Sequence, residues 1–402
     1  MSASDPVVIV GAARTPMGGF LGDLKNVEAP KLGAVAIRAA LQRAGVAPEL
    51  VDEIIMGCVL PAGLGQAPAR QAALGAGLPL AAGATTINKM CGSGMKATMQ
   101  AHDALLADSA SVVVAGGMES MSNAPYLLTR ARSGFRMGHN QAMDSMFLDG
   151  LEDAYDKGRL MGTFAEDCAQ DFQFTRLEQD SYALISLERA LAAQKSGAAG
   201  REIAPVETGG KTPVTIEADE QPAKARPDKI PTLKPAFRAG GTVTAANSSS
   251  ISDGAAALVL MRRSRAEALG LAPLATIVAH VGHAMEPRNF PVAPIGAMRK
   301  LFDKTGWSAD GVDLFEINEA FAVVAMAAMR ELRLPYEKIN VRGGACALGP
   351  PIGASGARIL VTLLSAMEER AAKRGVAAIC IGGGEATAMA VERAERKATS
   401  LP

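Results

Sequence analysis

Cys91 stands at a strand–helix junction, where a cysteine can act as a nucleophile. A short strand pattern over residues 84–88 precedes it, and Gly92-Ser93-Gly94 opens a helical pattern over residues 95–106. The unpaired N–H groups and the dipole at a helix N-terminus favour negative charge and lower the pKa of a thiol placed there. Because the thiolate is the reactive form, Cys91 is a candidate nucleophile. The alternative is a buried cysteine that packs as a small hydrophobic residue.

Composition excludes several classes of function. Lys+Arg and Asp+Glu number 41 each among 402 residues, and aromatic residues make up 4%, which argues against nucleic acid and anionic membranes as partners. The chain has neither a signal-peptide pattern nor an apolar run of about 18 residues that could span a membrane. Its five cysteines are widely spaced and include no Cys-x-x-Cys pair, so we expect a reducing, cytoplasmic compartment and neither a zinc site nor a disulfide framework.

Strand and helix patterns alternate along the chain, which predicts an α/β fold. The first half is expected to have strands at 7–10, 53–60, 84–88 and 112–115, and helices at 31–44, 67–74 and 95–106. Turn residues and mixed charge dominate 120–242, where only 177–195 has the pattern of a long helix. Strand patterns resume at 243–247 and 255–261. We therefore expect a long excursion from the first half.

The second half repeats the pattern of the first. Strands are expected at 275–281, 313–317, 339–341 and 376–381, and helices at 295–304, 321–332 and 354–374. Each half closes with a strand, a glycine-rich turn, a long helix, an apolar strand and Gly-Gly, which indicates an internal duplication. Two similar halves would bring their strand-end loops to a shared interface, where sites tend to form.

Four motifs carry a family resemblance: Asn88–Lys96, Asn318–Phe321, Gly343–Gly356 and Cys380–Gly384. In this order and spacing the chain resembles the thiolases, in particular their acetyl-CoA acetyltransferase branch. The resemblance implies duplicated βαβαβαββ halves, packed as α-β-α-β-α layers with an inserted loop domain. The N-terminal half would comprise residues 1–119 and 243–272. Residues 120–242 would form the loop domain that covers CoA, and residues 273–402 would form the C-terminal half.

The resemblance also implies a ping-pong Claisen reaction that forms or thiolytically cleaves acetoacetyl-CoA or a similarly short 3-oxoacyl-CoA. Cys91 would take the acyl group as a thioester, and Cys380 would deprotonate the second acetyl-CoA. The N–H groups of Cys91 and Gly382 would form one oxyanion hole, and Asn318 would contribute to another through a held water.

The residues implied to bind substrate are Leu151, Ala245, Ser249, Ala320, Phe321, Lys224 and Arg226. The cations would meet the CoA phosphates, although a solvated charged loop explains them equally well. The apolar residues could instead be core, and Ser249 a turn residue. CoA thioesters are substrates, and no metal or bound redox cofactor is implied. We expect a homo-oligomer, a tetramer or a dimer.

Pro350 departs from the family pattern, because relatives carry a histidine at this position in a Gly-His-Pro element. Proline has no titratable group and no backbone N–H, and loss of a positioned general base typically costs ~10²–10⁴-fold in rate. Arg342 also stands where an asparagine is usual. His102 is expected on an exposed helix face and His139 in a loop, whereas His280 or His283 could face the site.

Three alternatives to a fully active short-chain enzyme follow. The chain could be a degenerate thiolase that binds acyl-CoA without efficient turnover, which Pro350 favours. It could be a 3-ketoacyl-CoA thiolase with a broader chain-length range. A decarboxylating condensing enzyme of the ketoacyl-synthase kind is disfavoured by Cys380, because such enzymes pair their cysteine with two histidines.

Overall fold

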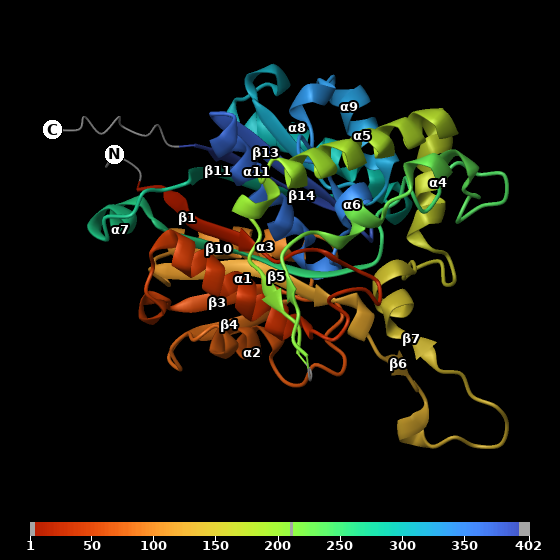
Figure 1. Ribbon diagram of the computed structural model, residues 1–402, viewed down its shortest axis with the longest axis horizontal. Coiled ribbons are helices and arrows are strands. Elements are labelled where there is room, and N and C mark those ends of the chain that lie inside the picture. The colour runs from red at the N-terminus through yellow and green to blue at the C-terminus, as the bar shows by residue number, and fades with distance from the viewer. Residues whose placement is uncertain (1–4, 210–211, 394–402) are drawn as a thin grey trace.

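The N-terminal half forms one side of the central sheet in the computed structural model, which describes residues 5–209 and 212–393 (Figure 1). Its strands lie side by side in the order β4 (Gly83–Ile87), β3 (Glu53–Gly57), β5 (Val112–Ser120), β10 (Ser252–Arg262) and β1 (Val7–Arg14), with the short β2 (Gly18–Gly19) paired to β10. β3 runs parallel to both neighbours, and β10 runs antiparallel to β5 and β1. The excursion 120–242 therefore leaves at the end of β5, and the chain returns to the sheet as β10.

The C-terminal half repeats this order. Its strands are β12 (Leu314–Ile317), β13 (Arg374–Ile381), β14 (Glu385–Glu392) and β11 (Ala275–Ala284), with β12 parallel to β13 and β14 antiparallel to both neighbours. Ile339 forms a single parallel bridge to Phe315, in the place that β4 has in the first half. The repeated order confirms the duplication. The strand expected at 339–341 is reduced to this bridge, and β14 was missed.

The two halves join edge to edge. Val8 lies opposite Thr276 and Ile9 opposite Ala275, so β1 and β11 link all ten strands into one sheet. Residues of both halves, including Ile9 and Ile379, share one apolar cluster with the helices between them. The interface between the two halves is therefore a continuous hydrophobic core.

Helices cover both outer faces and fill the centre, which gives the expected α-β-α-β-α layers. α1 (Ala29–Ala44) and α2 (Pro68–Gly75) pack on the outer face of the first half, and α8 (Ala293–Thr305) and α9 (Ala322–Leu332) on that of the second. α3 (Ser93–Leu106) and α11 (Ser355–Glu369) lie between them. α11 is buried on nearly all sides, as its apolar run Ile-Leu-Val-Thr-Leu-Leu requires.

The first turns of α3 and α11 touch through glycine. A Cβ on Gly94 would lie 2.7 Å from the backbone nitrogen of Ala357, and one on Gly356 would lie 2.5 Å from that of Met95. Both positions therefore exclude larger residues. This contact places the N-termini of the two central helices, one from each half, directly together.

The excursion contains more structure than its composition suggested. A hairpin of β6 (Tyr126–Leu127) and β7 (Met143–Asp144) extends away from the body (Figure 1), and a π-helical turn spans Phe147–Leu151. α4 (Met161–Asp171), α5 (Arg176–Lys195), the pair β8 (Val206–Glu207) and β9 (Thr215–Ile216), and α6 (Glu220–Lys224) follow. The long helix expected at 177–195 is confirmed as α5, which a Thr175–Glu178 capping box starts.

The strand expected at 243–247 is wrong. The carboxylate of Glu166 accepts hydrogen bonds from the N–H groups of Thr242 and Val243, and the side chain of Asn247 accepts one from Thr244. These side chains satisfy backbone groups that a neighbouring strand would otherwise pair. Two short helices complete the fold, α7 (Arg263–Ala268) and α10 (Ala345–Leu348). Within the described parts of the chain, no helix combines the length and apolar character needed to cross a bilayer.

Candidate active site

Cys91 lies in a tight turn between β4 and α3. The hydroxyl of Ser93 accepts a hydrogen bond from the N–H of Lys89 and donates one to the carbonyl of Met90. Met90 has φ +47, a left-handed conformation that a side chain with a Cβ rarely adopts. Such backbone strain clusters at functional sites. The turn holds Cys91 half-buried, one residue before the Gly92 cap of α3.

Cys380 and Gly382 meet Cys91 from the other half of the chain. The N–H of Gly382, just beyond β13, lies near enough to the sulfur of Cys91 to lower the pKa of that thiol. The side chain of Ile381 packs so tightly on Gly92 that a Cβ there would clash with it. The thiol of Cys380 lies near enough to that of Cys91 to raise its own pKa further. A salt bridge between Lys89, in the Cys91 turn, and Glu385, at the start of β14, also joins these two segments.

The charge state of Cys91 depends mainly on burial. Burial raises the pKa of the Cys91 thiol, and nearby Glu119 raises it further. The N–H groups of Gly382 and of Cys91 itself lower that pKa, but burial outweighs them. The pKa of Cys91 therefore lies above the ordinary thiol value, although its place before a helix would by itself lower it. The fully buried Cys380 has a pKa well above the ordinary thiol value. Both thiols need a proton acceptor before they can react.

Asn318 is fixed at the end of β12, beside the strand that carries Cys380. Its N–H donates to the carbonyl of Ala378 at 3.0 Å, and its side-chain oxygen accepts from Arg358 at 3.4 Å. The side chain is buried. The structure thus brings Asn318 to the strand ends where Cys380 and Gly382 lie.

Glu319, which was not singled out from the sequence, organises the loops behind Asn318. Its fully buried carboxylate accepts hydrogen bonds from the hydroxyls of Tyr182 and Ser186, the amide of Asn340 and the N–H of Cys346. These partners come from α5, from the loop of Asn340 and from the short helix α10 (Ala345–Leu348). Its place within the Asn318–Phe321 motif was the available sequence signal.

Pro350 lies in a loop packed against the Cys91 turn. Gly349 has φ +86, and a Cβ at this position would clash with Ser252. Ile352 shares a small apolar cluster with Cys91 and Leu151. Pro350 itself is half-buried. The loop therefore reaches the site, but the proline offers it neither a base nor an N–H donor.

The histidines do not replace the missing base. His280 faces His102 at 3.1 Å, near the far end of α3. His102 follows Cys91 by eleven positions, about 16 Å along the helix at the usual rise. The ring of His283 packs against Gly296 of α8, and His139 is exposed in the β6–β7 loop. The expectation that His102 lies on an exposed face is wrong, because its side chain is only 12% exposed.

Glu119, also missed at the sequence level, is a buried acid beside Cys91. Its carboxylate accepts hydrogen bonds from the N–H groups of Val59, Leu60 and Gly353 at 2.9–3.1 Å. Burial nevertheless raises the pKa of Glu119 to about 7. Glu119 joins the end of β5 to the loops after β3 and Pro350. An acidic residue shortly after the apolar run 112–115 and its two glycines was the one sequence signal.

We expect the Glu119 carboxyl to make the stability of the protein fall with rising pH. Its pKa in the folded state, about 7, exceeds the ordinary value of 4.5, so the folded chain binds this proton more tightly than the unfolded chain. This contribution is complete below pH 4.5 and is lost as pH rises through 7. It amounts to roughly 3 kcal/mol.

The variant Glu119→Gln tests this assignment, because an amide cannot take up or release the proton that the Glu119 carboxyl does. Urea unfolding at pH 5 and pH 8 should show a smaller difference in unfolding free energy for Glu119→Gln than for the parent. Glu49→Gln, at an exposed position in a short helical turn, is the control and should behave like the parent. Equal pH dependence in all three proteins would contradict the assignment.

Three of the expected substrate-binding residues lie together. Both the N–H and the hydroxyl of Ser249 donate to the carbonyl of Ala320, at 2.9 and 2.8 Å, and Ser248 forms a bridge to Phe321. Leu151 packs in the same small cluster as Cys91. Ala245 is exposed on the loop before Ser249.

The two expected phosphate-binding cations lie on and just after α6. The Nζ atom of Lys224 lies 2.5 Å from the carboxylate of Glu220 and 3.4 Å from that of Asp23. Lys224 is therefore already paired with acidic groups in this structure. Arg226 is exposed on the segment that follows.

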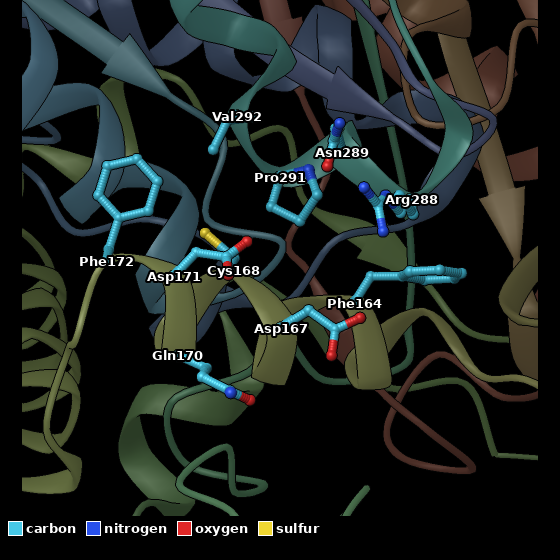
Figure 2. Close-up of a pocket in the computed structure, with 10 residues that line it drawn as sticks. All are labelled: Phe164, Asp167, Cys168, Gln170, Asp171, Phe172, Arg288, Asn289, Pro291 and Val292. Atoms are coloured by element: carbon cyan, nitrogen blue, oxygen red, sulfur yellow. The ribbon is translucent and has the colours of Figure 1, made fainter.

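A surface pocket between α4 and residues 287–292 contains none of the expected catalytic residues (Figure 2). Asp167 and Arg288 stand at its wall, and Asp167 is paired with Arg159 and Arg238. Cys168 faces this pocket, and burial raises its pKa to about 12, which keeps the thiol neutral. Cys168 is thus a packing residue with an unreactive thiol.

Comparison with known proteins places this geometry in a family. The model of the thiolase N-terminal domain matches residues 7–264, and that of the thiolase C-terminal domain matches residues 271–393. Acetyl-CoA acetyltransferase 2 of Arabidopsis thaliana is 53% identical over 96% of both chains. The acetyl-CoA acetyltransferase of Cupriavidus necator is 50% identical over 96% of this chain and 99% of its own.

Solved structures agree with the sequence comparisons. The acetyl-CoA acetyltransferase of Bacillus anthracis superposes with a TM-score of 0.95 at 40% identity, covering 98% of this chain and all of the other. The Acat5 thiolase of Ascaris suum, solved in complex with coenzyme A, gives a TM-score of 0.92 at 41% identity, with 97% of this chain and 100% of that chain covered.

Proposed function

Because this chain belongs to the thiolase family, we propose that it forms or thiolytically cleaves acetoacetyl-CoA or a similarly short 3-oxoacyl-CoA. It is an acyltransferase, and its relatives at about 50% identity are named acetyl-CoA acetyltransferases. The observation that supports the proposal best is the meeting of two thiols, one from each half, at the N–H of Gly382.

In the first step the thiolate of Cys91 attacks the carbonyl carbon of an acyl-CoA. A new thioester bond forms, and CoA leaves with the proton that Cys91 gave up. The N–H groups of Gly382 and Cys91, which lie near the sulfur, supply donors for the negative oxygen of the intermediate. This arrangement supports a role for Gly382 in the oxyanion hole.

In the second step the Cys380 thiol first loses its own proton, because only the thiolate can act as a base. The Cys380 thiolate then removes a proton from the methyl group of a second acetyl-CoA, and the resulting carbanion attacks the acyl-enzyme and forms the new carbon–carbon bond. Cys91 leaves as a thiolate and takes up the proton that Cys380 first released. Asn318, held at the end of β12, would orient a water toward the oxygen of the second thioester. In the cleaving direction the same steps run backward, and Cys380 protonates the departing acetyl-CoA carbanion.

Turnover in this chain is reduced relative to relatives that carry a histidine at position 350. Burial keeps both thiols neutral, so the acylation step needs a base. Proline at the loop that packs against Cys91 supplies none. The proposed impairment thus rests on the first step and leaves the binding of acyl-CoA unaffected.

A thiolysis assay tests the function. With acetoacetyl-CoA and free CoA as substrates, the chain should produce two acetyl-CoA per cycle, at a rate above that of a Cys91→Ala control. A longer 3-oxoacyl-CoA in a parallel assay tests the alternative of a broader chain-length range. Saturable binding of acetyl-CoA, with no product and no acyl-enzyme, would instead establish the degenerate, binding-only alternative.

Further parts of the proposal concern assembly, compartment and domains. β4 is a sheet edge, and the β6–β7 hairpin exposes Phe135 and Met137, features that support a homodimer or tetramer. All five cysteines are free thiols, which supports a reducing, cytoplasmic compartment.

The repeated strand order supports an N-terminal half of residues 1–119 and 243–272 and a C-terminal half of residues 273–402, with residues 120–242 as the loop domain over CoA. Residues 1–4, 210–211 and 394–402 lie outside the described part of the chain.

The residues that bind CoA form the last part of the proposal. Ser249, Ala320 and Phe321 are proposed to line the pantetheine path with Leu151 and Ala245, and Arg226 to meet a phosphate. Lys224 would have to exchange Glu220 for a phosphate to take part. CoA thioesters and free CoA are the substrates of the proposed reaction.

A further inference from the structure

We propose that His102, Asp103 and His280 form a binding site for a divalent transition-metal ion of the zinc type, separate from the thiol site. His102 and Asp103 lie on α3, and His280 lies on β11. The ligand atoms are Nδ1 of His102, Oδ1 of Asp103 and Nε2 of His280. Two imidazoles and one carboxylate are a ligand set that zinc and related ions accept.

The spacing of the three atoms fits a metal. Nε2 of His280 lies 3.1 Å from Nδ1 of His102 and 3.0 Å from Oδ1 of Asp103. The remaining separation, from Nδ1 of His102 to Oδ1 of Asp103, is 3.3 Å. Tetrahedral coordination with zinc bonds of about 2.0–2.1 Å separates neighbouring ligand atoms by roughly 3.3 Å. An ion can therefore enter with shifts of a few tenths of an ångström.

The hydrogen bonds within the cluster show how an ion could enter. In this structure Nε2 of His280 is hydrogen-bonded to both Nδ1 of His102 and Oδ1 of Asp103. A single proton shared among these three atoms accounts for the contacts. Metal binding displaces that proton, and all three atoms then become ligands.

Access and surroundings set the affinity. Each histidine side chain is 12% exposed, whereas Asp103 is 58% exposed, so the carboxylate side opens to solvent and leaves room for a water ligand. Lys304 and Arg262 face the cluster, and their charges oppose a cation. The Nζ atom of Lys304 is directed to the carbonyl of His280, at 3.2 Å. Asp103 offsets one of these charges, so we expect micromolar binding.

The position of the site gives it a structural consequence. α3 belongs to the N-terminal half and β11 to the C-terminal half, so one ion would tie the two halves together. The site is about 16 Å along α3 from Cys91. We therefore expect the metal to raise thermal stability and to leave the thiolysis rate nearly unchanged. At a hundredfold excess over the dissociation constant the melting temperature should rise by roughly 3 °C.

Titration of the full chain with Co²⁺ tests the site. One ion per chain should bind, with visible absorption of nitrogen and oxygen ligation and without the near-ultraviolet charge-transfer band of a thiolate ligand. His280→Gln and the more exposed Asp103→Asn should each weaken binding at least tenfold and abolish the zinc-induced rise in melting temperature. His139→Gln, in the exposed β6–β7 loop, is the matched control and should bind as the parent does.

Two outcomes would overturn the proposal. Binding of equal strength in His280→Gln and Asp103→Asn would place the ion elsewhere. A thiolate charge-transfer band would assign it to a cysteine. Asp103→Asn changes an exposed side chain, so it keeps the test decisive if His280→Gln folds poorly.

Discussion

Replacing Pro350 by histidine is expected to raise the rate of acetoacetyl-CoA thiolysis by about 10²–10⁴-fold, the usual effect of a positioned general base. Burial keeps the Cys91 thiol neutral, and the loop of residue 350 packs against the Cys91 turn through Ile352. Position 350 is half-buried and precedes Pro351, which holds it in an extended conformation that histidine adopts readily. Initial rates of the parent and the Pro350→His variant, measured at several pH values, give the comparison.

Pro350→Ala separates the base from the backbone effect. Alanine removes the proline ring and restores the N–H without adding a titratable group, so its rate should stay near that of the parent. A new pH dependence near the pKa of histidine should appear only in Pro350→His. If both variants gain equally, the restored N–H is responsible. If neither gains, the parent already has a working base and the impairment hypothesis is wrong.

Replacing Cys91 by alanine is expected to abolish acyl transfer, a loss on the order of 10⁴-fold or more, as for other covalent nucleophiles. Cys91 is the half-buried thiol that lies near the N–H of Gly382. Mass spectrometry of the intact protein after incubation with acetyl-CoA should show one acetyl group on the parent and none on Cys91→Ala. Peptide analysis should place that group on Cys91.

Cys380→Ala tests the second thiol by a different readout. It should still accept an acetyl group on Cys91, because Cys380 acts only after acylation, yet condensation and thiolysis should be lost. Cys168→Ala is the matched control, because this buried thiol lies at the surface pocket of Figure 2 and should retain both activities. Acetylation that persists in Cys91→Ala at another cysteine would move the nucleophile and end the assignment.

The fold was predictable where its signals are local. The alternation of apolar strands and helices is a property of neighbouring residues, and it indicated both the α/β class and the duplication. β14 was not predicted, because its alanine-rich sequence Glu-Ala-Thr-Ala-Met-Ala-Val-Glu has little intrinsic strand preference. Only pairing with β11 and β13 makes it a strand. The strand expected at 243–247 failed because the distant Glu166 satisfies that backbone instead.

The sequence by itself determined which residue types could carry the chemistry: a thiol before a helix, a second thiol before a triple glycine, and a proline in place of a base. Only the tertiary structure decided how those groups behave. The pKa of Cys91 rises because burial outweighs the N–H donors, and burial depends on both halves packing together. Glu119 binds segments from both halves, and the His102–His280 pair spans 178 positions of sequence. Such groupings arise from long-range packing, which no local pattern in the sequence encodes.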